Sequence, residues 1–229
     1  MSGAGPGPDV GELEFRMRPA AGPPAGALIL NHGRGADEHD LYPLLDQLDP
    51  ERRLLGVSSG APIRGLPPGG RHWYIVERVG FPHHETFHSS YSDLADGIDA
   101  ILAGHGLDYS QAVIGGFSQG AVMSYAVALG ADRPTPAGII ALSGFLPVVE
   151  GWEPVLEGRE GLRAFIHHGA RDPVIASELG ARAAETLRAG GIDVEFLETP
   201  VGHALPPQAV VRARALVAAV TGAASGSPA

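Results

Sequence analysis

The residues with the clearest chemical potential lie in the stretch 112–129. Gly116-Phe117-Ser118-Gln119-Gly120 matches the pattern G-x-S-x-G, between an apolar run of strand character and a second run that is typical of a buried helix. A serine on a sharp turn from strand to helix is the arrangement of a nucleophile elbow, in which the flanking glycines let the chain turn tightly. The free N–H groups and the positive dipole at the helix start stabilise an anion beside the serine. The sequence therefore predicts Ser118 as a catalytic nucleophile.

A second match to the same pattern tests this interpretation. Gly56-Val57-Ser58-Ser59-Gly60 also fits G-x-S-x-G, but residues 61–70 after it are rich in proline and glycine. Such a segment does not form a helix, so no helix start lies beside this serine. We interpret the match at Ser58 as a chance one.

Two further polar residues follow predicted apolar strands downstream of the elbow. Asp172 precedes a proline and His203 follows a glycine, so either residue alone would be interpreted as part of a turn or a surface loop. Together with Ser118 they give the chain order Ser, Asp, His, which is that of α/β-hydrolases. The order predicts His203 as the general base and Asp172 as the residue that orients it. Asp37 and Asp40 precede the nucleophile and suit a helix start, so we interpret them as structural.

A serine hydrolase also needs two donors for the oxyanion of its tetrahedral intermediate. The backbone N–H of Gln119, directly after the nucleophile, is one predicted donor. The second is the N–H of Arg34, in the loop after the apolar run 25–30, where Gly33 and Gly35 let the backbone approach closely.

Composition restricts the other possible functions. The 229 residues are 44% hydrophobic and 18% charged, which is typical of one domain with a substantial core. All 16 basic residues are arginine, so lysine chemistry is excluded, and the absence of cysteine excludes thiolate nucleophiles and disulfides. The net charge of −10 argues against nucleic acid or an anionic membrane as a partner. The predicted chemistry requires no cofactor.

The ends of the chain carry no targeting signal. Residues 1–9 lack the basic and apolar regions of a signal peptide, and no apolar run is long enough to span a membrane. We therefore expect a cytoplasmic protein without stable membrane insertion, in which a homodimer is compatible with the sequence. The small-residue composition predicts disorder at 1–9 and 222–229, around a single domain at 10–221.

Strand and helix patterns alternate between these ends. The strands are expected at 12–18, 25–30, 53–57, 112–117, 137–142, 162–167 and 192–197. The helices are expected at 41–48, 91–102, 119–130, 177–189 and 206–220, with Ser90 and Asp93 as a capping box for the second. This alternation predicts an α/β fold with a mostly parallel sheet and helices on both faces, and it places the polar loops at the carboxyl ends of the strands.

Several segments together resemble the phospholipase/carboxylesterase family of small α/β-hydrolases, which includes acyl-protein thioesterases. The matching segments are His32-Gly33-Arg34-Gly35-Ala36-Asp37-Glu38, Gly115-Gly116-Phe117-Ser118-Gln119-Gly120, Leu142-Ser143-Gly144-Phe145-Leu146-Pro147, His168-Gly169-Ala170-Arg171-Asp172-Pro173-Val174 and Gly202-His203. The resemblance covers about 25–220 and implies the α/β-hydrolase fold without a large lid domain, with the catalytic residues at the positions named above.

The resemblance also implies a substrate class. It suggests cleavage of small carboxylic esters or acyl thioesters in a shallow acyl site, with Trp73 and Leu146 as lining residues. Residues 79–88 do not align with the family, so the acyl preference does not follow from the resemblance.

Within that segment, His84-Glu85-Thr86-Phe87-His88 matches H-E-x-x-H, which on a helix supplies two zinc ligands and a general base. Pro82 lies just upstream, two serines follow, and no third ligand completes the pattern. We expect no metal site, and we expect these histidines on a solvated loop or at a helix entry. A metal-dependent hydrolase therefore stays an alternative, as does a transacylase with the same triad. A non-catalytic protein of this fold would show a damaged triad, and the sequence shows none.

Overall fold

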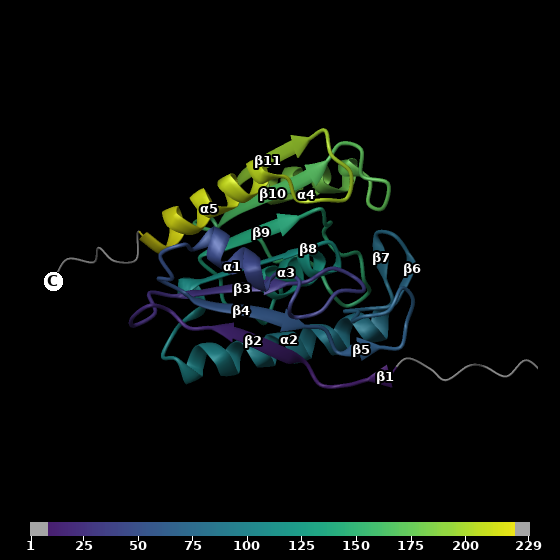
Figure 1. Cartoon of the computed structure of the whole chain (residues 1–229). Coiled ribbons are helices and arrows are strands. Elements are labelled where there is room, and N and C mark those ends of the chain that lie inside the picture. The colour runs from purple at the N-terminus through teal and green to yellow at the C-terminus, as the bar shows by residue number, and fades with distance from the viewer. Residues whose placement is uncertain (1–8, 223–229) are drawn as a thin grey trace, which may run out of the picture.

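A seven-stranded sheet organises the protein in the computed structural model, which describes residues 9–222 (Figure 1). The strand order is β11-β10-β9-β8-β3-β4-β2; β2 is antiparallel to β4, and every other neighbouring pair is parallel. The strands are β2 (Glu14–Arg18), β3 (Ala27–Asn31), β4 (Leu55–Gly60), β8 (Ala112–Phe117), β9 (Gly138–Leu142), β10 (Arg163–Gly169) and β11 (Asp193–Thr199). The chain has the α/β-hydrolase fold that the sequence predicts.

Helices cover both faces of this sheet (Figure 1). They are α1 (Tyr42–Leu48), α2 (His84–Gly104), α3 (Gln119–Leu129), α4 (Ser177–Ala189) and α5 (Pro207–Gly222). Leu28 and Leu30 of β3 belong to the core beneath α1 and α5, whereas Ala27 and Ile29 belong to the core beneath α2, α3 and α4. Successive residues of a strand point to opposite faces, so a continuous apolar run such as β3 is buried on both sides.

The start of α2 differs from the sequence prediction. The helix begins at His84 rather than near Tyr91, and its N-cap is His83, whose Nδ1 accepts a hydrogen bond from the N–H of Thr86. The predicted capping box at Ser90 is wrong because Ser90 lies inside the helix, where its hydroxyl donates to the Trp73 carbonyl at 2.5 Å. A tertiary partner therefore satisfies the serine that the sequence pattern assigned to a helix end.

Two short strand pairs extend the fold beyond the sheet. β1 (Asp9–Val10) pairs with β5 (Ile63–Arg64), and β6 (Val76–Arg78) pairs with β7 (Phe81–Pro82) as a hairpin. The turn and second strand of this hairpin belong to the segment 79–88, which the sequence resemblance leaves unaligned.

The segments expected to be disordered fall almost entirely outside the described residues. At their inner ends, Asp9 lies in β1 and Gly222 is the last residue of α5, so these two residues belong to regular elements. Among residues 9–222, no helix combines the length and apolar character that a membrane span requires.

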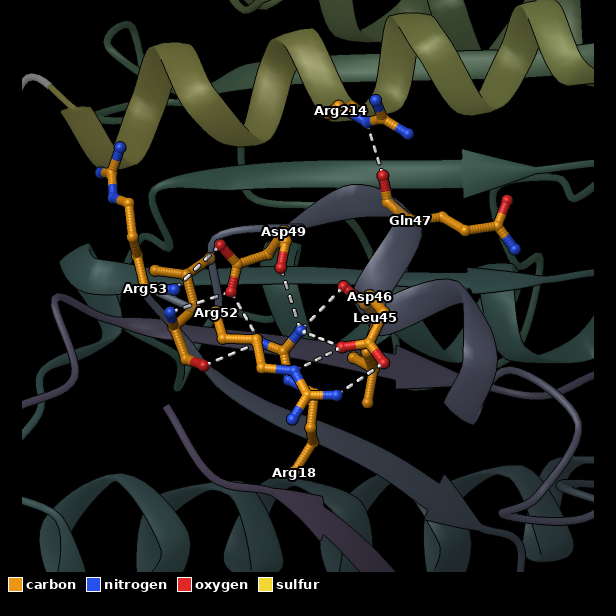
Figure 2. A network of polar contacts seen from close by, with 9 residues as sticks. Arg18, Leu45, Asp46, Gln47, Asp49, Arg52, Arg53 and Arg214 are labelled. Atoms are coloured by element: carbon orange, nitrogen blue, oxygen red, sulfur yellow. Dashed lines mark hydrogen bonds and ion pairs between the residues drawn. The ribbon is translucent and has the colours of Figure 1, made fainter. Parts of the chain in front are cut away.

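A buried ion pair between Arg18 and Asp49 lies at one edge of the sheet, near the amino ends of the parallel strands (Figure 2). The Arg18 side chain is 2% exposed and donates to Asp49 Oδ2 at 2.6 Å and to the carbonyls of Leu45 and Leu54 at 3.0 and 2.9 Å. The Asp49 carboxylate also accepts from the N–H groups of Arg53 and Leu54, both at 3.0 Å. These contacts join β2, the end of α1 and the start of β4.

Candidate active site

Ser118 stands on the sharp turn between β8 and α3. Its φ is 55° and its ψ is −119°, a conformation that non-glycine residues adopt only when the surrounding structure holds them in it. A Cβ added to Gly116 or Gly120 would lie 2.5 or 1.9 Å from the Asn31 carbonyl oxygen. Both positions therefore require glycine because the turn is pressed against the end of β3.

Asp172 and His203 meet at the carboxyl ends of β10 and β11. His203 Nδ1 lies 2.6 Å from Asp172 Oδ2, and the Asp172 side chain is fully buried. The other carboxylate oxygen accepts hydrogen bonds from the N–H groups of Val174 and Ile175, at 2.8 and 3.0 Å. The carboxylate is thus fixed by its own loop and oriented toward the imidazole.

The environment keeps the Asp172 carboxyl ionised. Burial alone would raise its pKa, but hydrogen bonds from the Ile175 N–H, the His203 ring and the Val174 N–H together hold the pKa below its usual value. A carboxylate that is ionised at neutral pH fixes the proton of His203 on Nδ1 and stabilises the imidazolium.

Ser118 and His203 line one cavity of about 340 Å³. The His203 ring packs against Phe117, with 4.7 Å between ring centroids and 51° between planes. Within residues 9–222 the Ser118 hydroxyl makes no hydrogen bond to His203. Catalytic hydrogen bonds commonly tighten only when substrate is bound, so the shared cavity is the relevant geometry.

The two predicted oxyanion donors also border this cavity. Gln119 is the first residue of α3, so its N–H has no acceptor within the helix. Arg34 lies in the loop after β3, and both residues line the cavity. A Cβ on Gly33 would lie 3.1 Å from the Phe117 ring and 3.4 Å from Ser118 Cβ, which shows how closely this loop approaches the elbow.

A buried histidine that sequence reasoning missed fixes the Arg34 loop. His32 Nε2 accepts from the Ala61 N–H at 3.0 Å, so the proton resides on Nδ1, which donates to the Gly33 carbonyl at 2.6 Å. Burial lowers the pKa of His32 to about 4, so the ring is neutral at pH 7. His32 directly follows β3 and opens one of the segments that resemble the family, but the sequence assigned it no role of its own.

The predicted lining residues are displaced by one position. Trp73 is fully buried and donates through Nε1 to the His32 carbonyl at 2.8 Å, so it supports the Arg34 loop from behind. Its neighbour Tyr74 lines the cavity, and Phe145 lines it in place of Leu146, which packs against the core. The expectation for Trp73 and Leu146 is therefore wrong, because adjacent side chains point in different directions.

The Gln119 side chain connects the elbow to this wall. Its Oε1 accepts from the Trp73 N–H at 3.1 Å and its Nε2 donates to the Tyr74 carbonyl at 2.9 Å. The side chain of Gln119 thus holds the Trp73–Tyr74 segment against the elbow.

The remaining cavity wall is mainly apolar. Its apolar members are Pro68, Val76, Val79, Phe117, Val174 and Ile175, and its charged members are Arg34, Asp40 and Arg78. Val76, Arg78 and Val79 come from the β6–β7 hairpin, so this hairpin forms one side of the site. Asp40, interpreted as structural from the sequence, also borders the cavity.

A second histidine that the sequence reasoning missed lies behind Asp172. The His168 side chain is fully buried, and its Nε2 donates to the Ile175 carbonyl at 2.9 Å and lies 3.5 Å from Asp172 Oδ2. The Ile175 peptide is therefore held between His168 and the carboxylate. The run His167-His168-Gly169 at the end of a strand was the available signal.

The H-E-x-x-H segment forms the start of α2, which is the helix entry that was one of the two expected placements, and Pro82 lies just before the helix. His84 and His88 start α2 with ring centroids 4.6 Å apart, and His88 Nε2 donates to the Glu150 carbonyl at 2.8 Å. In the part of the chain that the structure describes, no group of three or more histidine, aspartate or glutamate side chains is placed to hold a metal ion. None of these histidines lines the cavity of Ser118.

Comparisons with known proteins agree with the fold of this chain. A family model described as Phospholipase/Carboxylesterase matches residues 14–220. Acyl-protein thioesterase 1 of Debaryomyces hansenii is 28% identical over 207 residues, which cover 82% of this chain and 88% of that protein. The putative hydrolase MhqD of Bacillus subtilis is 28% identical over 187 residues, covering 82% and 90%.

Solved structures share the fold at lower identity. The Bacillus cereus carboxylesterase superposes with a TM-score of 0.77 at 21% identity, covering 91% of this chain and 94% of that one. The carboxylesterase from Mesorhizobium loti gives 0.75 at 22% identity, covering 90% and 94%.

Proposed function

The chain belongs to the phospholipase/carboxylesterase family, and we propose that it hydrolyses carboxylic esters through Ser118, His203 and Asp172 with an acyl-enzyme intermediate. Its curated relatives place it among hydrolases of esters or thioesters. The proposal assigns the roles of individual residues within that activity.

The steps follow from the chemistry of the three groups. His203 Nε2 takes the Ser118 proton as the hydroxyl attacks the ester carbonyl, and it returns that proton to the leaving alcohol or thiol. Water then attacks the acyl-enzyme with His203 again as base. Asp172 holds the imidazole through Nδ1 in both halves of the reaction. The developing oxyanion is stabilised by the backbone N–H groups of Gln119 and Arg34, each worth about 100- to 1,000-fold in rate.

One observation carries the proposal. Asp172 binds His203 at Nδ1 at 2.6 Å, which leaves Nε2 available as a base, and the His203 ring lines the same cavity as Ser118. An oriented base facing a strained serine at the start of a helix is the arrangement that acyl transfer requires.

A series of p-nitrophenyl esters from acetyl to dodecanoyl tests the proposal, with Ser118→Ala alongside. We expect kcat/KM to peak at short acyl chains because the cavity holds about 340 Å³. Ser118→Ala should lower kcat/KM by about 1,000-fold or more on every ester. Turnover that survives in this variant would remove Ser118 from the mechanism, and a maximum at dodecanoyl would indicate a long-chain acyl substrate instead.

A further inference from the structure

One buried polar group in the cavity wall has no partner in the protein. Tyr74 is 2% exposed, and its hydroxyl makes no hydrogen bond to any residue between 9 and 222. The Tyr125 hydroxyl is also unpartnered but fully enclosed, whereas Tyr74 lines the cavity and its hydroxyl is not among the enclosed atoms. A buried tyrosine hydroxyl normally finds a partner, so a group of the substrate is the expected acceptor.

Two arginines line the same cavity. In the described part of the chain, neither Arg34 nor Arg78 forms an ion pair with a carboxylate, although the Arg78 guanidinium lies 3.7 Å from the centroid of the Phe81 ring. Burial raises the pKa of Tyr74 well above its usual value, and the positive charge of Arg34 opposes that effect. The positive charge of Arg34 therefore contributes to the electrostatic potential at the Tyr74 hydroxyl.

The acidic groups nearest to this region do not neutralise it. Glu38, in the same loop as Arg34, pairs with Arg71 at 3.2 Å, and Glu14 also pairs with Arg71. Asp40 lines the cavity but lies beyond ion-pair distance of Arg34 and Arg78. In a protein with a net charge of −10, a cavity lined by one carboxylate and by two cations that are unpaired among residues 9–222 carries a local positive charge.

We propose that the Tyr74 hydroxyl and the Arg34 guanidinium, with Arg78 of the β6–β7 hairpin beside them, bind a carboxylate of the substrate. The preferred substrates are then esters that carry a carboxylate in addition to the ester group, such as half-esters of dicarboxylic acids. A guanidinium and a hydroxyl together offer the donors that a carboxylate accepts. This inference rests on the proposed function and specifies its substrate class.

Matched pairs of anionic and neutral esters test the subsite. Methyl hydrogen adipate against methyl hexanoate places the carboxylate on the acyl side, and 4-acetoxybutanoate against butyl acetate places it on the alcohol side. Acid release in a pH-stat gives kcat/KM for each ester. We expect the anionic member of at least one pair to be preferred by about tenfold, as for a charged hydrogen bond. This preference should weaken as salt screens the charges.

Variants then identify the groups responsible. In Arg34→Gln, which keeps the backbone N–H, and in Tyr74→Phe, the ratio of anionic to neutral kcat/KM should fall toward one. Asp40→Asn should raise the ratio by removing a repelling charge. The control is Arg182→Gln, which changes the net charge equally on an exposed residue of α4 outside the cavity, and it should keep the wild-type ratio.

The outcomes separate the two proposals. A wild-type ratio of one or less in both pairs, or a ratio unchanged in both Arg34→Gln and Tyr74→Phe, overturns the carboxylate subsite. Ser118→Ala is the independent arm, because turnover of all four esters should disappear in it whatever the ratio. Turnover that persists there contradicts the proposed function instead.

Discussion

Two buried aspartates at opposite edges of the sheet are held in nearly the same way. Asp49 accepts two backbone N–H groups from the residues that follow it and one side-chain donor, Arg18, at 2.6 Å (Figure 2). Asp172 accepts two backbone N–H groups from its own loop and one side-chain group, His203, also at 2.6 Å. The local structure around a carboxylate therefore does not distinguish a structural site from a catalytic one.

The partners make the difference. Arg18 is permanently charged, and both of its terminal nitrogens donate to Asp49, Asp46 or backbone carbonyls, whereas its buried Nε has no partner among residues 9–222. We call this network closed because neither Arg18 nor Asp49 lines the cavity of Ser118. An imidazole can accept and release a proton, and the His203 ring that Asp172 holds lines the cavity. One aspartate holds the chain together, and the other holds a proton acceptor in place.

Substitution of each aspartate by asparagine should separate these roles. Asp172→Asn should lower kcat by about 10,000-fold, because the imidazole loses its orientation and charge stabilisation, while the melting temperature changes little. Asp49→Asn should lower the melting temperature and leave kcat of the folded protein near the wild-type value. Ester hydrolysis and thermal melts of both variants check this, and a well-folded Asp49→Asn protein without activity would contradict the comparison.

Removal of Arg18, the positive partner of Asp49, should have the next largest effect, which is on the unfolding free energy. Arg18→Met leaves the Asp49 carboxylate buried without its cation, and we expect a loss of about 3–5 kcal/mol of unfolding free energy. The double variant Arg18→Met/Asp49→Leu should recover much of this loss because neither charge is then buried alone. Denaturant unfolding of the two single variants and the double variant measures the coupling; additive losses would show that the pair does not act as a unit.

Lower pH should reduce the unfolding free energy through buried histidines on the active-site side of the sheet rather than through the Arg18–Asp49 pair. Burial lowers the pKa of His32 and of His167 to about 4. The unfolded chain therefore binds more protons between pH 6.5 and 4, and unfolding free energy falls as pH falls through that range, by up to about 3 kcal/mol per histidine. Denaturant unfolding between pH 7 and 4 measures the slope. His167→Gln should reduce it, and an unchanged slope would contradict the assignment.

His168 should give the smallest effect. We interpret it as a positioning residue, since it holds the Ile175 carbonyl while the Ile175 N–H binds Asp172. His168→Ala should loosen that N–H bond, raise the pKa of Asp172, move the acidic limb of the kcat/KM profile to higher pH and lower kcat by about tenfold. His168→Gln, whose amide can still donate to the Ile175 carbonyl, should restore part of the pH profile and part of kcat. A lower melting temperature with an unmoved pH profile would indicate a packing role alone.

The sequence predicted the parts of the fold that follow from periodicity and turn chemistry. The apolar runs predicted the buried strands, and the glycines around Ser118 predicted the turn that the Asn31 carbonyl enforces. The order of Ser118, Asp172 and His203 predicted loops that the sheet brings to one edge. Their catalytic roles stay predictions until the variants are measured.

What the sequence did not predict depends on contacts between distant segments. Trp73 and Tyr74 differ by one position, yet one supports the Arg34 loop from the core and the other faces the cavity. In irregular segments no period of two or 3.6 tells which neighbour points inward. Likewise, Ser90 fits a helix cap by pattern, and only the Trp73 carbonyl across from it explains its place within α2.

The most direct test of the account is the site of covalent trapping by a fluorophosphonate ester, mapped by peptide mass spectrometry. Ser58 and Ser118 both occur in G-x-S-x-G, but only Ser118 faces the cavity with His203, and Ser58 is fully buried. We predict stoichiometric labelling of Ser118 in the wild-type protein, much slower labelling in Asp172→Asn, and a wild-type rate in folded Asp49→Asn. Labelling at another serine, or an equal rate in Asp172→Asn and the wild type, would contradict the account.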